Sequence, residues 1–163
     1  MINKYAVQEI NEESSAKARG NYLPVSARFC VEICSFIRKK NLQKAKELMT
    51  LTIEKKAPIP FKRFVHDLAH RKGMRSGRYP VLACKAILQL LESVEANAQF
   101  KGLNASNLVI THIMANKASR PWKYGRHSRR RSKRTNVEIV VEEKAPVKKE
   151  AKKPEAKKPE VKK

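Results

Sequence analysis

The chain has 163 residues, of which 37 are Lys or Arg and 15 are Asp or Glu, so its formal net charge is +22. This length favours one domain, or one domain with tails, and so large a surplus indicates a polyanionic partner, nucleic acid first and an anionic membrane second. No apolar run is long enough to span a bilayer, and the polar first 20 residues lack the apolar segment of a signal peptide, so we expect an intracellular protein.

The first third of the chain predicts an extended segment followed by two helices. Residues 21–25 read as extended because a proline restricts the residue before it. Ser26 suits the N-cap of a helix expected over about 27–39. Asn41 suits the N-cap of a second helix that ends before Pro58. Apolar residues repeat at helical spacing in both: Phe29, Cys30, Ile33, Phe36 and Ile37 in the first, and Leu42, Ala45, Leu48, Met49, Thr52 and Ile53 in the second.

Residues 61–79 are rich in Lys, Arg and Gly, which argues against a buried element. A short helix around Arg63–His70 is one interpretation of this segment. The remainder, RKGMRSGRY, predicts a basic loop because its glycines and charges interrupt any apolar period.

The same segment contains HDLAH, which resembles the H-E-x-x-H zinc signature. The acid here is Asp67, whose side chain is shorter than the glutamate of that signature. No third ligand is evident, since His112 lies in a predicted strand and His127 in a basic arm. We therefore predict neither a metal site nor catalysis, and expect His66 and His70 to pack locally or to donate to RNA.

The three cysteines are Cys30, Cys34 and Cys84. They form no C-x-x-C pair and no matching second pair, so the spacing does not indicate zinc. We expect reduced thiols that act as small core residues.

A third helix is expected to follow Pro80, which suits the first position of a helix. Gly102 supplies a plausible end. This helix should be the most buried of the three, because few of its residues are charged. Its apolar face is predicted to comprise Leu82, Cys84, Ile87, Leu88, Leu91, Val94 and Ala98.

Two stretches near the C-terminus, LVITHIMAN and TNVEIVVE, are rich in β-branched residues and alternate in polarity, which predicts two antiparallel strands. Between them Arg120–Thr135 reads RPWKYGRHSRRRSKRT, in which eight of sixteen residues are Lys or Arg and none is acidic. The segment is too long for a tight turn and too basic for a core. We expect an extended basic arm whose self-repulsion a partner must neutralise.

The residue types of this arm suit RNA. Arginine offers a planar fork of donors to phosphate and stacks on bases, and Trp122 and Tyr124 add flat surfaces that fit the unstacked bases of RNA loops. Pro121 and Gly125 would bend the backbone. Each phosphate contact contributes roughly −0.7 to −0.9 to the log–log dependence of affinity on salt, so binding should weaken steeply as salt rises. The alternative interpretation is a solvated loop without a partner.

From residue 143 onward the composition changes to Lys, Pro, Glu and Ala, with AKKPE at 151–155 and again at 156–160. This segment lacks large apolar residues and so cannot offset its ordering entropy. We expect a disordered tail over 143–163.

Four segments occur in the order of one protein family. They read SARFCVEICSFIRKKNLQKAKELMTLTIEKKAPIPFKR, then GRYPVLACKAILQLLESVEANAQFKGLNASNLVITHI, then Pro121-x-x-x-Gly125-Arg126, and finally NVEIVVEE. Together they resemble the universal large-subunit ribosomal protein L-twenty-two, which is L-seventeen in eukaryotes. The resemblance runs from about Tyr5 to Glu143, and PIPFKR and GRYP are similar to its archaeal and eukaryotic branch.

The resemblance implies an α+β fold, with three helices on a small antiparallel sheet of about three strands and a long β-hairpin that protrudes over 108–142. It places this hairpin in a single domain over 1–142, followed by the tail over 143–163. It also implies a structural protein of the large subunit in the cytoplasmic ribosome, neither an enzyme nor dependent on a cofactor or metal. Such a protein binds large-subunit ribosomal RNA, aids its assembly and extends the hairpin along the peptide exit tunnel. Neighbouring large-subunit proteins are expected partners, the nascent peptide is a further candidate, and a membrane is not expected.

Two groups of residues are expected to carry RNA binding. In the arm, the cations should contact phosphates or line the tunnel, and the aromatic residues should stack on bases or pack at the bend: Arg120, Trp122, Lys123, Tyr124, Arg126, Arg129, Arg130, Arg131, Lys133 and Arg134. The domain surface should add further cations: Arg28, Arg38, Lys39, Lys40, Lys62, Arg63, Arg71, Lys72, Arg75 and Arg78.

Two rival classes compete with this interpretation. A chromatin-type DNA-binding protein would account for the Lys-Pro tail, but no predicted helix has an obvious recognition face for a major groove. A polybasic protein of the membrane surface ranks last, because the basic groups accompany aromatics and a hairpin rather than an amphipathic helix. Comparing the affinity of the protein for ribosomal RNA fragments with its affinity for duplex DNA would distinguish a ribosomal protein from the chromatin-type rival.

Overall fold

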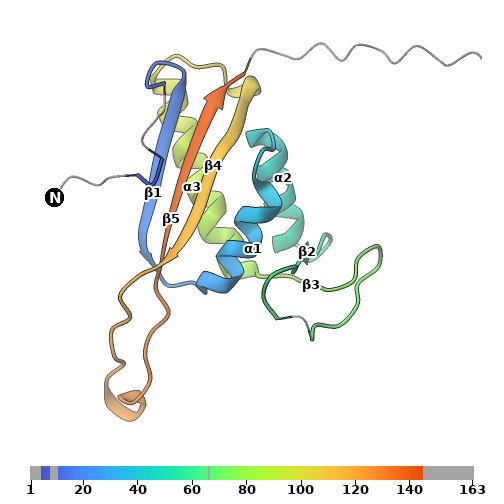
Figure 1. Ribbon diagram of the computed structural model, residues 1–163, viewed down its shortest axis with the longest axis vertical. Coiled ribbons are helices and arrows are strands. Elements are labelled where there is room, and N and C mark those ends of the chain that lie inside the picture. The colour runs from blue at the N-terminus through green and yellow to red at the C-terminus, as the bar shows by residue number, and fades with distance from the viewer. Residues whose placement is uncertain (1–4, 8–10, 66, 145–163) are drawn as a thin grey trace, which may run out of the picture.

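The structure, a computed structural model, describes residues 5–7, 11–65 and 67–144 (Figure 1). The elements in chain order are β1 (Ser15–Leu23), α1 (Ala27–Ile37), α2 (Leu42–Ile53), β2 (Ile59–Pro60), β3 (Gly77–Arg78), α3 (Val81–Phe100), the 3₁₀ helix η1 (Ala105–Asn107), β4 (Leu108–Lys117), the 3₁₀ helix η2 (Gly125–His127) and β5 (Thr135–Glu143). Helices α1 and α3 pack against one face of a three-stranded sheet and α2 packs beside them. The predicted α+β fold is confirmed, and the tail from residue 145 lies outside the described residues.

The sheet has the order β1-β5-β4, and both pairings are antiparallel. The fully buried apolar side chains of β1 are the small ones of Ala16 and Ala18, and Leu23 at its end packs partly buried against the core. A Cβ added at Gly20 would lie 3.0 Å from the methyl carbons of Leu90 in α3, so the glycine lets this helix approach the strand closely. The central strand supplies the larger core residues Val137, Ile139 and Val141.

The helix boundaries follow local chemistry. The Asn41 side chain accepts a hydrogen bond from the Gln43 N–H at 2.9 Å, which confirms the predicted cap of α2. Ser26 occupies the N-cap position of α1, but its side chain makes no capping hydrogen bond. Pro80 precedes α3 at the N-cap, and Gly102 follows it with a φ of +77°, a conformation that glycine adopts without strain.

Helix α1 ends at Ile37, two residues before the predicted end. Lys39 adopts a φ of +63°, and its N–H donates to the Ile110 carbonyl of β4 at 2.9 Å. This pairing with β4 replaces the helical hydrogen bond, so the basic cluster after α1 forms a turn.

Three other predictions were wrong in detail. The extended N-terminal segment begins at Ser15 rather than at residue 21, and it pairs with β5. The described residues of 63–70 form no helix. Leu82 is 77% exposed, because the face of α3 that enters the core is the one carrying Ala83, Cys84, Ile87, Leu91, Val94 and Ala98.

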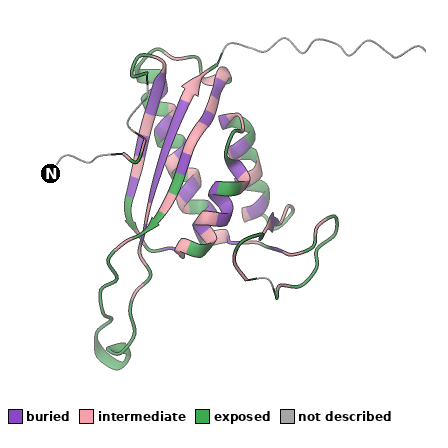
Figure 2. Ribbon diagram, viewed as in Figure 1, coloured by how far each residue is buried: buried purple, intermediate pink, exposed green. Residues whose placement is uncertain are grey.

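Two long connections project from the same end of the molecule (Figure 1): the one between β4 and β5, and the one between β2 and β3. Helices α1 and α3 also begin at this end, so their partially positive N-termini lie there. Figure 2 shows that both connections are largely exposed, whereas buried residues are concentrated in the sheet and on the inner faces of the helices. Positive charge therefore gathers at this end of the molecule.

Candidate nucleic-acid interface

The connection between β4 and β5 is an ordered hairpin, and we call residues 118–134 the arm. Backbone hydrogen bonds cross it: the Lys123 N–H donates to the Arg130 carbonyl at 2.8 Å, and the Ser132 N–H donates to the Pro121 carbonyl at 2.9 Å. In Figure 1 the arm extends beyond the end of the sheet and away from the helices. The predicted extended basic arm is therefore present, with its own internal order.

The two aromatic residues of the arm have different environments. Trp122 forms an antiparallel bridge with Arg131, whose guanidinium carbon lies 4.2 Å from the centroid of the indole ring. Tyr124 is 95% exposed beside Gly125, whose φ of +63° forms the bend of the tip. Trp122 thus stabilises the arm, and Tyr124 is presented to solvent.

The arm displays its charge outward. None of its residues is acidic, and all its cations are exposed apart from Arg134, which is half-buried. These cations are Arg120, Lys123, Arg126, Arg129, Arg130, Arg131, Lys133 and Arg134. A surface of this kind suits a phosphate backbone.

The root of the arm is tied to the end of β1. The Arg134 guanidinium donates to the Tyr22 carbonyl at 3.2 Å, and the Tyr22 N–H donates to the Asn136 side-chain oxygen at 2.9 Å. The buried Thr135 hydroxyl donates to the Val25 carbonyl at 2.9 Å. These contacts fix the direction in which the arm leaves the sheet.

A cavity of about 350 Å³ lies where the arm meets α1, and we call it the root pocket. Six cations line it, drawn from both predicted groups and from β4: Arg28, Arg78, Lys117, Arg120, Lys133 and Arg134. Among the described residues that line the pocket, none is acidic. Cations far apart in the sequence thus converge on one concave surface.

A buried carboxylate positions the basic loop beside this pocket. Glu32 of α1 is 3% exposed and accepts hydrogen bonds from the N–H groups of Lys62, Arg63 and Phe64, at 3.1, 2.8 and 2.7 Å. The next residue, Val65, has a φ of +61°, which is rare for a β-branched side chain. This left-handed residue lies inside the segment expected to be helical, and a right-handed helix cannot pass through it, so the predicted helix around 63–70 does not form.

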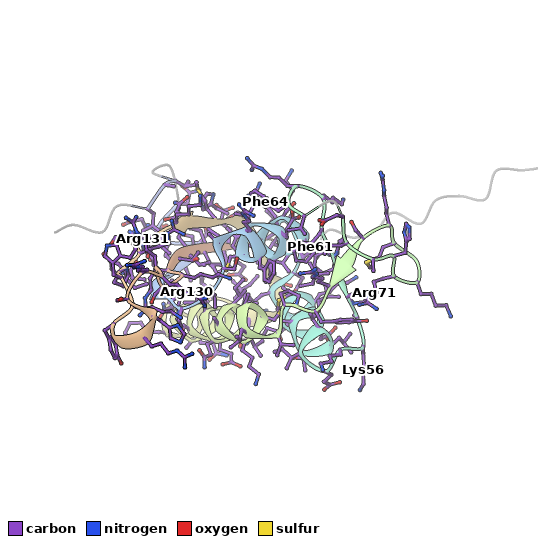
Figure 3. The ribbon with its side chains drawn as sticks, turned by 90° about the horizontal axis from the view of Figure 1, so that it is seen from below. Lys56, Phe61, Phe64, Arg71, Arg130 and Arg131 are labelled. Atoms are coloured by element: carbon purple, nitrogen blue, oxygen red, sulfur yellow. The ribbon has the colours of Figure 1, made fainter. Side chains whose placement is uncertain are left out.

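The predicted cations of the loop are exposed: Lys62, Arg63, Arg71, Lys72, Arg75 and Arg78. Two of them pack on neighbouring rings, with the guanidinium carbons of Arg63 and Arg71 each 5.5 Å from the ring centroids of Phe64 and Tyr79. Figure 3, seen from the end that carries both connections, places Arg130 and Arg131 of the arm on one side and Arg71 of the loop on the other. The far parts of the two basic segments therefore lie on opposite sides of the helices, while their near ends meet at the root pocket.

The basic cluster at the end of α1, Arg38, Lys39 and Lys40, makes contacts within the domain as well as exposing charge to solvent. Arg38 donates to the Ile113 carbonyl of β4 at 3.1 Å. The Lys40 ammonium lies 4.0 Å from the centroid of the Phe36 ring, and burial, followed by the charge of Lys44, lowers the pKa of Lys40. Of this predicted cluster, Lys39 is exposed, and Lys40 lines a groove with Lys62.

The zinc-like motif HDLAH lies only partly within the described residues. His66 lies outside the described residues, and the Nδ1 atom of His70 lies 2.9 Å from the Arg75 carbonyl oxygen in the basic loop. His112 is paired with Glu138 of β5 at 3.4 Å. In the part of the chain that the structure describes, no three His, Cys, Asp or Glu residues could hold a metal ion. None of the described helices is long and apolar enough to cross a membrane.

Sequence reasoning missed two residues of this surface. Lys117 lies opposite Thr135 at the last pair of the β4–β5 ladder, so the hairpin register alone would place it beside Arg134. Glu32 is the only acid within α1, and it precedes the buried residues Ile33 and Cys34. An acid at such a position indicates that hydrogen-bond donors from another segment pair with its carboxylate inside the protein.

The comparisons with known proteins agree with this architecture. A family model described as ribosomal protein L22p/L17e matches residues 18–142. The chain is 41% identical to large ribosomal subunit protein uL22 of Archaeoglobus fulgidus, over 85% of this chain and 94% of that protein. It is 42% identical to uL22 of Methanoculleus marisnigri, over 83% and 94%, and 44% identical to uL22 of Thermoplasma acidophilum, over 81% and 91%. The chain therefore belongs to the ribosomal protein L22p/L17e family and is a structural component of the large subunit of the cytoplasmic ribosome, not an enzyme.

Proposed function

We propose that this protein binds large-subunit ribosomal RNA, aids its assembly and extends the arm along the peptide exit tunnel. The observation that carries the proposal is the arm itself, an internally hydrogen-bonded hairpin with eight cations and no acid that projects from the domain. Its like charges repel one another, and phosphates that lie between them relieve this repulsion. The exposed ring of Tyr124 offers a surface on which an unstacked base can lie.

The residues proposed to contact RNA are the two groups predicted from the sequence. In the arm they are Arg120, Trp122, Lys123, Tyr124, Arg126, Arg129, Arg130, Arg131, Lys133 and Arg134, and on the domain Arg28, Arg38, Lys39, Lys40, Lys62, Arg63, Arg71, Lys72, Arg75 and Arg78. The proposed unit of binding is a single domain over 1–142, with residues 143–163 as a tail. Within the tunnel, the nascent peptide is a further proposed partner of the arm.

The experiment is a filter-binding comparison of the full chain with large-subunit ribosomal RNA fragments and with duplex DNA of matched length. We expect the RNA fragments to bind at least tenfold more tightly at the same salt concentration, and the tagged protein to sediment with large subunits. Equal affinity for DNA, together with absence from the subunit fraction, would favour the chromatin-type rival.

A further inference from the structure

The root pocket has a second property besides its charge, and the inference drawn from it rests on the proposed function. We propose that the root pocket holds one unstacked nucleotide of the bound RNA, with the phosphate on the cations and the base against an apolar wall. This assigns a specific task to a concave site that is separate from the tip of the arm. The site is built at the junction of four segments: the start of α1, the basic loop, the end of β4 and the arm.

The positive charge of the pocket favours binding of an anion at one defined position. Cations such as Arg28 from the first turn of α1, Arg78 from β3 and Lys117 from the end of β4 reach one cavity from separate elements. In addition, the side chain of Ser26 makes no capping hydrogen bond at the N-terminus of α1. The N–H groups of that first turn and the positive end of the helix dipole therefore add to the attraction for a phosphate in the same cavity.

Apolar side chains also line the pocket, and together they provide its apolar wall: Val25, Phe29 and Val65. Phe29 is held in place by an edge-on contact with Phe61, with 5.4 Å between the ring centroids. A free phosphate gains nothing from such a wall, whereas a base does, because bases taken out of a stack are commonly bound against aromatic or apolar side chains. The volume of about 350 Å³ lies at the small end of the range for ligand pockets, which suits one nucleotide and excludes a duplex.

The backbone of this wall is held in a strained conformation. Val65 has a φ of +61°, and the three N–H groups that precede it donate to the buried Glu32. Left-handed backbone is unfavourable for a β-branched residue, and such strain is typically kept where a binding surface needs it. Glu32 thus acts as a positioning residue that keeps Val65 on the pocket wall in the free protein.

The test compares three RNA probes that share one duplex sequence: a perfect duplex, the same duplex with one bulged nucleotide, and a duplex whose bulge lacks the base. Affinities of the full chain are measured by fluorescence anisotropy at one salt concentration, with each of the four bases in the bulge. We expect at least one base-containing bulge to bind about tenfold more tightly than the perfect duplex and the abasic bulge, as is typical of one base bound against an aromatic side chain.

Two variants assign the preference to the pocket. Arg28→Gln with Arg78→Gln changes two exposed side chains of the pocket and should abolish the preference for the bulge. The matched control, Lys44→Gln with Lys85→Gln, removes the same charge from exposed positions of α2 and α3 and should retain the preference. Phe29→Leu roughly conserves apolar volume and should reduce binding of the base-containing bulge while leaving the abasic probe unchanged, with thermal unfolding as the check of folding.

The outcomes separate this inference from the proposed function. Equal affinity of the wild-type chain for all three probes, with tight and salt-dependent binding, would overturn the pocket and leave RNA binding intact. A preference that survives both in the arginine double variant and in Phe29→Leu would show that another surface binds the bulged base, which also overturns the pocket. Failure to bind any of the probes or the ribosomal RNA fragments would reject both.

Discussion

Trp122 and Arg131 face one another across the arm, with the guanidinium carbon 4.2 Å from the centroid of the indole ring, and the same two residues form an antiparallel bridge. The arginine is therefore both a candidate RNA contact and part of the structure that carries the other cations. Because this pair lies between the hydrogen bonds of Lys123 and Ser132, it holds the middle of the arm in register before any partner is present.

The first prediction concerns this pair. Trp122→Ala should raise the exchange rate of the Lys123 amide roughly two- to fivefold, because an exposed cation–π pair contributes about 0.5–1 kcal/mol. Native-state hydrogen exchange of the free protein measures it. Tyr124→Ala is the matched control, because the Tyr124 side chain is 95% exposed, and equal effects of the two changes would contradict a role of Trp122 in the order of the arm.

A second prediction separates RNA binding from folding. Replacing Arg129, Arg130 and Arg131 together by Gln should reduce the slope of log affinity against log salt for ribosomal RNA by about 2–3. The free energy of unfolding should fall by no more than about 1 kcal/mol, because these side chains are exposed and the loss is limited to the pair of Arg131 with Trp122. Filter binding at several salt concentrations and urea denaturation measure the two quantities.

The control for that triple variant neutralises three exposed lysines elsewhere, Lys44, Lys55 and Lys85. It removes the same charge from α2, the turn after it and α3. If the control lowered the salt slope as much as the arm variant does, net charge rather than the arm would govern binding.

Glu32 provides the third prediction. Glu32→Gln should lower the free energy of unfolding by about 1.5–3 kcal/mol, because hydrogen bonds to a charged acceptor are lost and the new amide N–H₂ opposes backbone donors. The amides of Lys62, Arg63 and Phe64, which donate to this carboxylate, should exchange faster. Urea denaturation with hydrogen exchange tests both, and Glu47→Gln on the exposed side of α2 should change stability by less than about 0.5 kcal/mol. Unchanged exchange at 62–64 would refute the positioning role.

The fourth prediction is a dependence of stability on pH. Hydrogen bonding from Lys46 holds the pKa of Glu95 below its ordinary value of 4.5, with Gln43 as a second donor, although partial burial acts in the opposite direction. A carboxyl whose pKa is lower in the folded state stabilises the fold above the unfolded pKa, and the effect is lost as the pH falls through the folded pKa.

The loss should be small, about 0.5–1 kcal/mol, because the ion pair lies near the surface between α2 and α3. Urea denaturation of the wild type and of Glu95→Gln should differ at pH 6, and the difference should shrink by pH 3. A difference of constant size at both pH values would show that the ionised carboxylate contributes nothing.

The cysteines give the fifth prediction. Cys30, Cys34 and Cys84 are buried free thiols, and burial raises the pKa of Cys30 and of Cys84 to about 12 and that of Cys34 well above its ordinary value. Because the thiolate is the reactive form, the native chain should resist a thiol reagent at pH 8, and all three should react in guanidinium chloride. Fast reaction of any thiol in the native chain would place it outside the core.

Much of the fold followed from local patterns in the sequence. The apolar periods of α1, α2 and α3, the Asn41 cap and the alternating strands β4 and β5 were predictable, because each is encoded within a short stretch of chain. The basic arm was predictable for the same reason, since eight cations without an acid between two strands cannot enter a core.

The remainder depended on contacts between distant residues. Most of strand β1 carries small residues, Ala16, Ala18 and Gly20, on its covered face, so its strand character arises from pairing with β5 and from the close approach of α3. The helix expected around 63–70 is absent from the described residues because Val65 has a left-handed backbone, next to the three N–H groups that bond to the distant Glu32.

The candidate site divides in the same way. The sequence by itself determined which residues are cationic, that most of them are exposed, and that the arm joins two antiparallel strands, because composition and periodicity are local properties. Only the tertiary structure decided that Arg28, Arg78, Lys117 and Arg134 share one pocket with an apolar wall. The physical reason is that three long-range contacts bring those segments together. They are the packing of α1 against the sheet, the hydrogen bond from Arg134 to the Tyr22 carbonyl, and the hydrogen bonds that the basic loop donates to the buried carboxylate of Glu32.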